Sequence, residues 1–133
     1  MEDRRLGKLA EIEISQEEGV IIVSVSGEFD FGVCEQLIVQ LSASGVKDPR
    51  GIVYDLDRAS FLDSEGIKAM LQCARKVLEK WGEKMGARVA IIAPRGIIHK
   101  TLTLTGIIGS GEREGIFRAF ASTDLALEHI KSQ

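Results

Sequence analysis

The spacing of hydrophobic residues along the chain changes between the period of a strand and the period of a helix. Residues 11–15 alternate, with Ile12 and Ile14 on one side, which is typical of an edge strand. Residues 20–26 (VIIVSVS) are β-branched and nearly continuous and therefore predict a buried strand. The short sequence EEG lies between the two runs and is a turn signal, so they are expected to form a hairpin.

Farther along the chain, apolar runs that suit buried strands alternate with segments of helical spacing. Further strands are expected at residues 51–56, 88–93 and 116–121. Helices are expected at residues 33–44, 64–85, 95–105 and 122–130. The second of these is predicted to be one long amphipathic helix, because apolar side chains recur in steps of three and four as far as Met85. Ser122 or Thr123 is expected to cap the last helix.

This order of elements predicts an α/β fold. Helical crossovers join parallel strands, so we expect a mixed, mostly parallel sheet of about five strands with about four helices, opened by a β-hairpin. Residues 9–131 are expected to form a single domain. Residues 1–8 are charged and are expected to be a loose N-terminal segment.

The composition narrows the class of protein. Hydrophobic residues make up 44% of the chain and charged residues 28%, as in an ordinary soluble domain. The net charge of −3 gives no strong attraction to nucleic acid or to anionic lipid. No apolar run approaches the ~18 residues that span a bilayer, and the N-terminus lacks the apolar core of a signal peptide. We therefore expect a cytoplasmic protein without direct nucleic-acid contact or membrane insertion.

Metal and cofactor chemistry find little support in the sequence. The two cysteines, Cys34 and Cys73, have no metal-like spacing, and Cys34 fits a buried reduced thiol on a helical face. The glycine-rich segment 106–115 has Glu112 where a phosphate-binding loop requires lysine. We expect no cofactor and no metal.

Catalysis is not indicated either. His99 and His129 lie on weak helical patterns and are interpreted as surface or packing residues. The acidic pair Asp55 and Asp57 could imitate an acid–base site, but turn and cap chemistry is its more common role. We expect no catalytic residues.

The most informative stretch is Asp63-Ser64-Glu65-Gly66. Here the chain leaves a predicted strand and enters a predicted helix, where unpaired N–H groups and the positive helix end favour a phosphate. Ser64 either caps the helix or presents its hydroxyl to a kinase. The physical chemistry alone favours the cap.

The run GIVYDLDRASFLDSEGIKAML resembles the signature of STAS domains, the fold of anti-sigma factor antagonists. In that family an apolar strand ends in Asp, and an apolar pair then precedes Asp-Ser-Ser-Gly or Asp-Ser-Thr-Gly. The residues that fit are Asp55, Phe61, Leu62, Asp63, Ser64, Gly66 and Ile67. Gly27 and Asp30 match the family's upstream Gly-x-x-Asp. TGI near residue 106 and AFASTDLALEHI at the end are also similar to family segments.

The resemblance implies a STAS fold and a regulatory switch in sigma factor control. An antagonist of this family binds an anti-sigma factor that is also a serine kinase, and releases it once phosphorylated. A phosphatase then resets it. Carried over to this chain, Ser64 is the phosphorylation site. The implied partner-binding residues are Asp30, Asp63, Ser64, Glu65 and Gly66.

The sequence departs from the family pattern at Glu65, which replaces the second hydroxyl residue and adds a charge where a kinase must dock. The stretch 63–88 is also longer than usual by about one helical turn, and the loop 107–115 looks expanded. Three other roles stay open. One is a scaffold subunit of a stressosome-like assembly, and another is a STAS subunit that docks on a membrane transport complex without phosphorylation. The third, from a different class, is a small enzyme or nucleotide-binding protein.

Overall fold

The structure is a computed structural model that describes residues 11–29, 36–37, 39–41, 43, 45, 48–93, 96–109 and 114–133. Its strands are β1 (Glu11–Glu17), β2 (Val20–Phe29), β3 (Gly51–Leu62), β4 (Val89–Ile92) and β5 (Arg118–Phe120). Its helices are α2 (Ser64–Val77), α3 (Ile97–Leu104), α4 (Thr123–Lys131) and the 3₁₀ segment η2 (Glu79–Arg88). Residues 36–37, 39–41 and 43 are also helical, which agrees with the helix predicted at 33–44.

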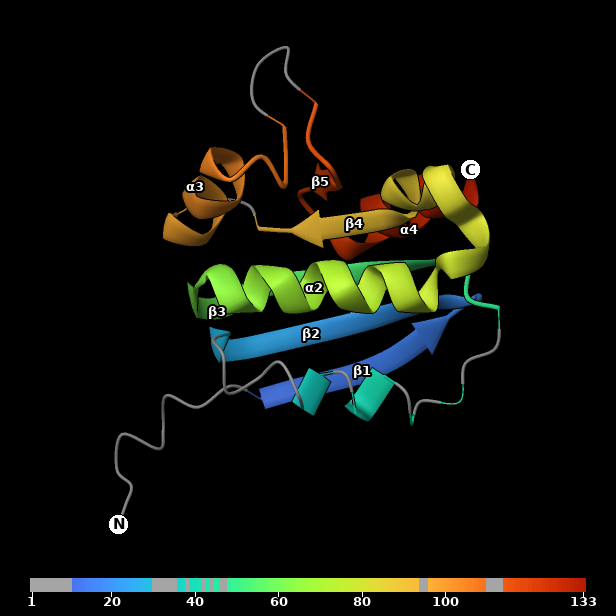
Figure 1. Cartoon of the computed structure of the whole chain (residues 1–133), viewed down its shortest axis with the longest axis horizontal. Coiled ribbons are helices and arrows are strands. Elements are labelled where there is room, and N and C mark those ends of the chain that lie inside the picture. The colour runs from blue at the N-terminus through green and yellow to red at the C-terminus, as the bar shows by residue number, and fades with distance from the viewer. Residues whose placement is uncertain are drawn as a thin grey trace.

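The strands form one sheet in the order β1-β2-β3-β4-β5. The first pair is antiparallel and the other three pairs are parallel. The prediction of a mixed, mostly parallel five-stranded sheet opened by a hairpin is therefore confirmed. Figure 1 shows α2 lying along the front of this sheet, with α4 partly behind β4.

The hairpin turn consists of two residues between the paired Glu17 and Val20. Glu18 and Gly19 both have positive φ, at 51° and 84°. Such a turn matches the right-handed twist of the flanking strands, and glycine meets its steric demand. The EEG sequence was therefore a sound turn signal.

Alternate residues of the same strands serve two separate hydrophobic layers. On one face, Val23 and Tyr54 pack with Met70 and Ala74 of α2. On the other face, Val20, Val53, Ala90 and Ile92 pack with Ala126, Leu127 and Ile130 of α4. Ser122 caps α4, since its hydroxyl oxygen accepts the N–H of Leu125 at 3.3 Å, which confirms one of the two predicted caps. None of the described helices is both long and apolar enough to cross a membrane.

The long helix predicted at 64–85 is wrong beyond residue 77. Leu78 ends α2 with φ −107° and ψ 24°, and Gly82, with φ 53°, breaks the helical geometry that follows. The apolar pattern continues because Trp81 and Met85 still pack against the core, but from a 3₁₀ segment. Hydrophobic periodicity thus indicated which side chains pack against the core but could not indicate the glycine kink.

Trp81 fixes this segment to the rest of the domain. Its indole N–H donates to the carbonyl of Pro49 at 3.1 Å. The guanidinium carbon of Arg88 lies 3.3 Å from the ring centroid, and Arg88 also donates to the carbonyl of Arg50 at 2.9 Å. Burial lowers the pKa of Arg88, as does the nearby charge of Arg50.

The third strand is longer than predicted, reaching Leu62 instead of ending at Leu56. Its pairing with β2 is irregular at two points, and at each of them β3 carries one extra residue. The extra residue at a bulge shifts the inward and outward alternation of side chains along the sequence by one position. The extra residue at the second bulge shifts it back. Leu56 and Leu62 consequently enter the same hydrophobic cluster, although the residues between them do not alternate.

The phenol of Tyr54 links this strand to α2. It is fully buried, and its O–H donates to the carbonyl of Met70 at 2.8 Å. Burial raises the pKa of Tyr54 well above its ordinary value, and nearby Cys73 adds to the effect. Ionisation of this phenol is therefore strongly opposed in the folded protein.

We predict that Tyr54 makes the protein sensitive to alkaline unfolding. Above pH ~10 the unfolded chain releases the phenol proton while the folded chain retains it, so stability falls as pH rises. Denaturant unfolding measured at increasing pH checks this, and tyrosinate absorbance reports on Tyr54 alone because the chain has one tyrosine. Tyr54→Phe is expected to lose about 1 kcal/mol at neutral pH but to decline less steeply above pH ~10. Equal slopes for the two proteins would contradict the prediction.

Candidate functional site

The end of the sheet at which α2 begins is the candidate site (Figure 1). Phe29 pairs with Leu62 where β2 and β3 end, and both side chains are buried. The N–H of Asp63 donates to the carbonyl of Phe29 at 3.4 Å. The two parallel strands together therefore fix where the helix starts.

Asp63 is the residue that caps α2. Its backbone is extended, with φ −108° and ψ −177°, and its Oδ1 accepts the N–H of Gly66 at 2.9 Å. Its carbonyl accepts the N–H of Ile67 at 3.1 Å, the first bond of the helical ladder. The expectation that Ser64 supplies the cap is therefore wrong. Asp is as good a cap as Ser, and here it stands one residue earlier, in the extended conformation that a cap requires.

Ser64 is the first residue of the helix and is exposed. Its hydroxyl makes no hydrogen bond to any residue that the structure describes. It projects from the positively polarised end of α2, where negative charge is stabilised. The arrangement leaves the oxygen open to an enzyme and suits a phosphate.

Gly66 is buried directly behind Ser64. A Cβ atom at this position would lie 2.5 Å from the carbonyl oxygen of Phe29 and 2.9 Å from a methyl carbon of Leu62. Only glycine lets the first turn of the helix approach the strand ends so closely. Gly66 contributes to the site by positioning Ser64.

Among the described residues, two carboxylates and one ammonium group carry the charge of this helix end. Asp63 and Glu65 flank Ser64, and Lys68 pairs with Glu65 at 3.2 Å between Nζ and Oε2. Asp30, the other acidic residue predicted at the partner surface, lies outside the described residues. The structure thus brings together four of the five predicted site residues, at consecutive positions along the chain.

Sequence reasoning missed Phe61 and Lys68 as members of the site. The family pattern treats Phe61 and Leu62 as one apolar pair, but Leu62 is buried and Phe61 is 46% exposed. Adjacent residues of a strand point to opposite faces, so strand alternation would have separated them. Lys68 follows Ser64 by four residues, a spacing that places both on one side of a helix.

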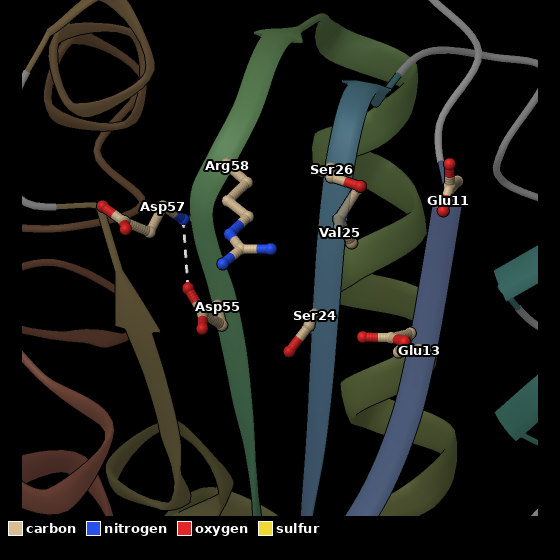
Figure 2. A pocket seen from close by; sticks show the side chains of 8 residues that line it. All are labelled: Glu11, Glu13, Ser24, Val25, Ser26, Asp55, Asp57 and Arg58. Carbon is tan, nitrogen blue, oxygen red and sulfur yellow. Dashed lines mark hydrogen bonds between the residues drawn. The ribbon is translucent and has the colours of Figure 1, made fainter.

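A hollow of about 460 Å³ lies on the other face of the sheet, with α2 seen behind the strands in Figure 2. It is lined by Glu11, Glu13, Ser24, Val25, Ser26, Asp55, Asp57 and Arg58. Oδ1 of Asp55 accepts the N–H of Asp57 at 3.1 Å, at the first bulge of β3. This carboxylate therefore has the turn role predicted for the acidic pair.

The other candidate histidine, cysteine and metal-binding groups that the structure describes do not form part of the Ser64 site. His129 contacts the carbonyl of Ala87 at 3.0 Å and the ring of Phe120, so it packs α4 in place as predicted. Cys73 is a buried, reduced thiol, whereas Cys34 and Glu112 lie outside the described residues. In the part of the chain that the structure describes, no cluster of three or more His, Cys, Asp or Glu residues could hold a metal.

Comparison with known proteins agrees with this geometry. Residues 11–122 match the family model of the STAS domain. The chain belongs to the STAS domain family. An anti-sigma F factor antagonist of Paenibacillus polymyxa is 28% identical over 98 residues, which cover 73% of this chain and 80% of the relative.

Solved structures show the same STAS fold. An anti-sigma factor antagonist from Mycobacterium paratuberculosis superposes with a TM-score of 0.73 and 25% identity, over 93% of this chain and 96% of that one. The murine anion transporter Slc26a9 is similar with a TM-score of 0.64 and 20% identity, over 90% of this chain but only 19% of the transporter. The second likeness establishes the fold alone.

We predict that substitutions of Asp63 separate its capping role from its charge. Asp63→Ala is expected to cost about 1 kcal/mol because the N–H of Gly66 loses its acceptor. Asp63→Asn is expected to cost roughly half of that or less, since asparagine caps nearly as well. Denaturant unfolding of both variants measures the difference. If the two variants were equally unstable, the bond to Gly66 would not be the stabilising contact.

Proposed function

We propose that this STAS domain protein is a non-enzymatic regulatory binding module, an anti-sigma factor antagonist that works by partner switching. It binds an anti-sigma factor with serine kinase activity while Ser64 is unmodified and releases it once Ser64 is phosphorylated. A phosphatase restores the binding form. The observation that carries this proposal is the exposed hydroxyl of Ser64, which no described residue binds, beside a cap that Asp63 already supplies.

Because Asp63 and not Ser64 is the cap, a phosphate on Ser64 breaks no hydrogen bond to a described residue. The helix end tolerates the added charge, with a gain of ~0.3–1 kcal/mol at an exposed site. Phosphorylation therefore leaves the fold intact and changes only the surface. That is the property a reversible binding switch requires.

The surface change is large for a partner that covers the site. The phosphate adds about −1.5 to −2 charges next to Asp63 and Glu65. A partner surface that fits the unmodified protein would have to bury this charge without a matching group, which costs several kcal/mol. Half-exposed Phe61, two residues before the cap, adds apolar area that a partner could cover.

The proposed partner surface comprises Asp30, Asp63, Ser64, Glu65 and Gly66, together with Phe61. The class of partner is suggested by the relatives, since both the Paenibacillus protein and the mycobacterial structure are anti-sigma factor antagonists. They match most of this chain, including the helix that begins at Ser64. We also propose a cytoplasmic location, which the proposed reactions with a kinase and a phosphatase support.

Incubation with a purified candidate anti-sigma factor kinase and ATP tests the modification, and mass spectrometry locates the phosphate. We predict a single phosphate on Ser64 and none in Ser64→Ala, which should still bind the kinase. Ser64→Asp is expected to bind at least about tenfold more weakly, a loss of about 1.4 kcal/mol. Calorimetric titration of each variant with the kinase measures the affinities.

Thr123→Asp is the matched control. Thr123 is the first residue of α4, follows a capping side chain and precedes an acidic residue, as Ser64 does in α2. It lies on the helix that packs against the other face of the sheet, so the same added charge is expected to leave binding unchanged. Full-strength binding by Ser64→Asp, or a phosphate elsewhere, would refute the switch. Large particles would then favour the stressosome-like scaffold, and co-purification with a transporter would favour the transport complex.

A further inference from the structure

The ion pair between Glu65 and Lys68 lies on the exposed first turns of α2. Nζ of Lys68 is 3.2 Å from Oε2 of Glu65, with 66% and 39% of the two side chains exposed. Glu65 is also the position at which the chain departs from the family's usual hydroxyl residue. The pair therefore joins the unusual residue of the motif to a cation that the motif does not specify.

Lys68 stands one helical turn beyond Ser64. Residues four apart on a helix have Cβ atoms roughly 5–6 Å from one another, and a lysine side chain can bridge that distance. The ammonium group that now holds Glu65 is consequently within reach of a phosphate on Ser64. A phosphate carries about −1.5 to −2 charges on three oxygens, so it attracts the ammonium group more strongly than one carboxylate does.

We propose that Lys68 is the counter-ion of phosphorylated Ser64, which it binds by leaving Glu65. This inference rests on the proposed function in taking Ser64 as the modified residue. Lys68 would act as a positioning residue that holds the phosphate against the helix. Asp63 keeps its bond to the N–H of Gly66 throughout.

The exchange has a consequence for the partner. Before modification, Nζ of Lys68 lies 3.2 Å from Oε2 of Glu65. After the exchange this positive charge no longer offsets the charge of Glu65, so one phosphorylation adds the phosphate and also withdraws a cation from the neighbouring carboxylate. A hydroxyl residue at position 65 would have no charge for Lys68 to offset, and this gives Glu65 a specific role in the release step.

The pKa of the second ionisation of the phosphate depends on the charges around it and can be measured directly. Phosphoserine is introduced at position 64 during translation, without a kinase, and phosphorus NMR follows the titration in the full chain. An i,i+4 ion pair is worth ~0.2–0.5 kcal/mol, which corresponds to a pKa change of about 0.2–0.4. Lys68→Gln is therefore expected to raise the second phosphate pKa by that amount, and Lys68→Arg to keep it near the original value.

Lys76→Gln is the matched control, because Lys76 is an exposed lysine on the same helix two turns farther on. It should leave the phosphate pKa unchanged. The transfer itself is read from the side-chain NMR signals of Lys68. Glu65→Gln should shift these signals in the unphosphorylated protein and leave them nearly unchanged in the phosphorylated one.

An equal phosphate pKa in the original protein and in Lys68→Gln would overturn the proposal, as would an equal effect of Lys76→Gln. A Lys68 signal that still responds to Glu65→Gln after phosphorylation would show that the pair does not separate. Circular dichroism checks that each variant is folded. Because no kinase or partner takes part, these outcomes are independent of the binding and kinase experiments, and either proposal can fail alone.

Discussion

The close contact between the first turn of α2 and the ends of β2 and β3 is the constraint on which the site depends. The carbonyl of Phe29 accepts the N–H of Asp63, and the same oxygen would lie 2.5 Å from any Cβ at position 66. The helix can occupy this place only because Gly66 has no side chain and Asp63 satisfies the N–H of that glycine. Ser64 lies between these two fixed residues and is exposed at the surface.

Because of this constraint, neighbouring residues have separate structural and chemical roles. Asp63 caps, Gly66 packs and Leu62 fills the core, whereas Ser64, Glu65 and Lys68 make no contribution to the buried interior. A modification of Ser64 can therefore be added and removed without unfolding the domain. A binding switch that responds to charge needs this separation, because the added charge must weaken binding of the partner without destabilising the fold.

Much of the fold could be predicted from the sequence, because the two cores impose two clear patterns. Residues such as Val53 and Tyr54 are buried on opposite faces, which produced the continuous apolar runs of the parallel strands. The errors arose where backbone geometry, and not burial, decides the outcome. The helix ends at Leu78 and Gly82 kinks the 3₁₀ segment that follows, but the apolar pattern continues through both. The two bulges of β3 interrupt the alternation in the second half of the strand, so the sequence pattern did not predict it.

The candidate site was predictable for a different reason. Its residues are adjacent in sequence, so the motif required no knowledge of tertiary contacts. The sequence could not show which residue of the motif caps the helix, because Ser and Asp are nearly equally good caps. The exposure of Phe61 and the position of Lys68 relative to Ser64 depend on which side of a strand or helix each residue occupies.

The paired bulges of β3 also leave this region free to change in length. Each bulge absorbs one extra residue of β3, so Leu62 still pairs with Phe29 and both side chains face the core. Loss of one extra residue would remove its bulge and leave this pairing, and with it the start of α2, in place. The spacing between Asp55 and Asp63 can therefore change by single residues among relatives while the helix still begins at the same end of the sheet.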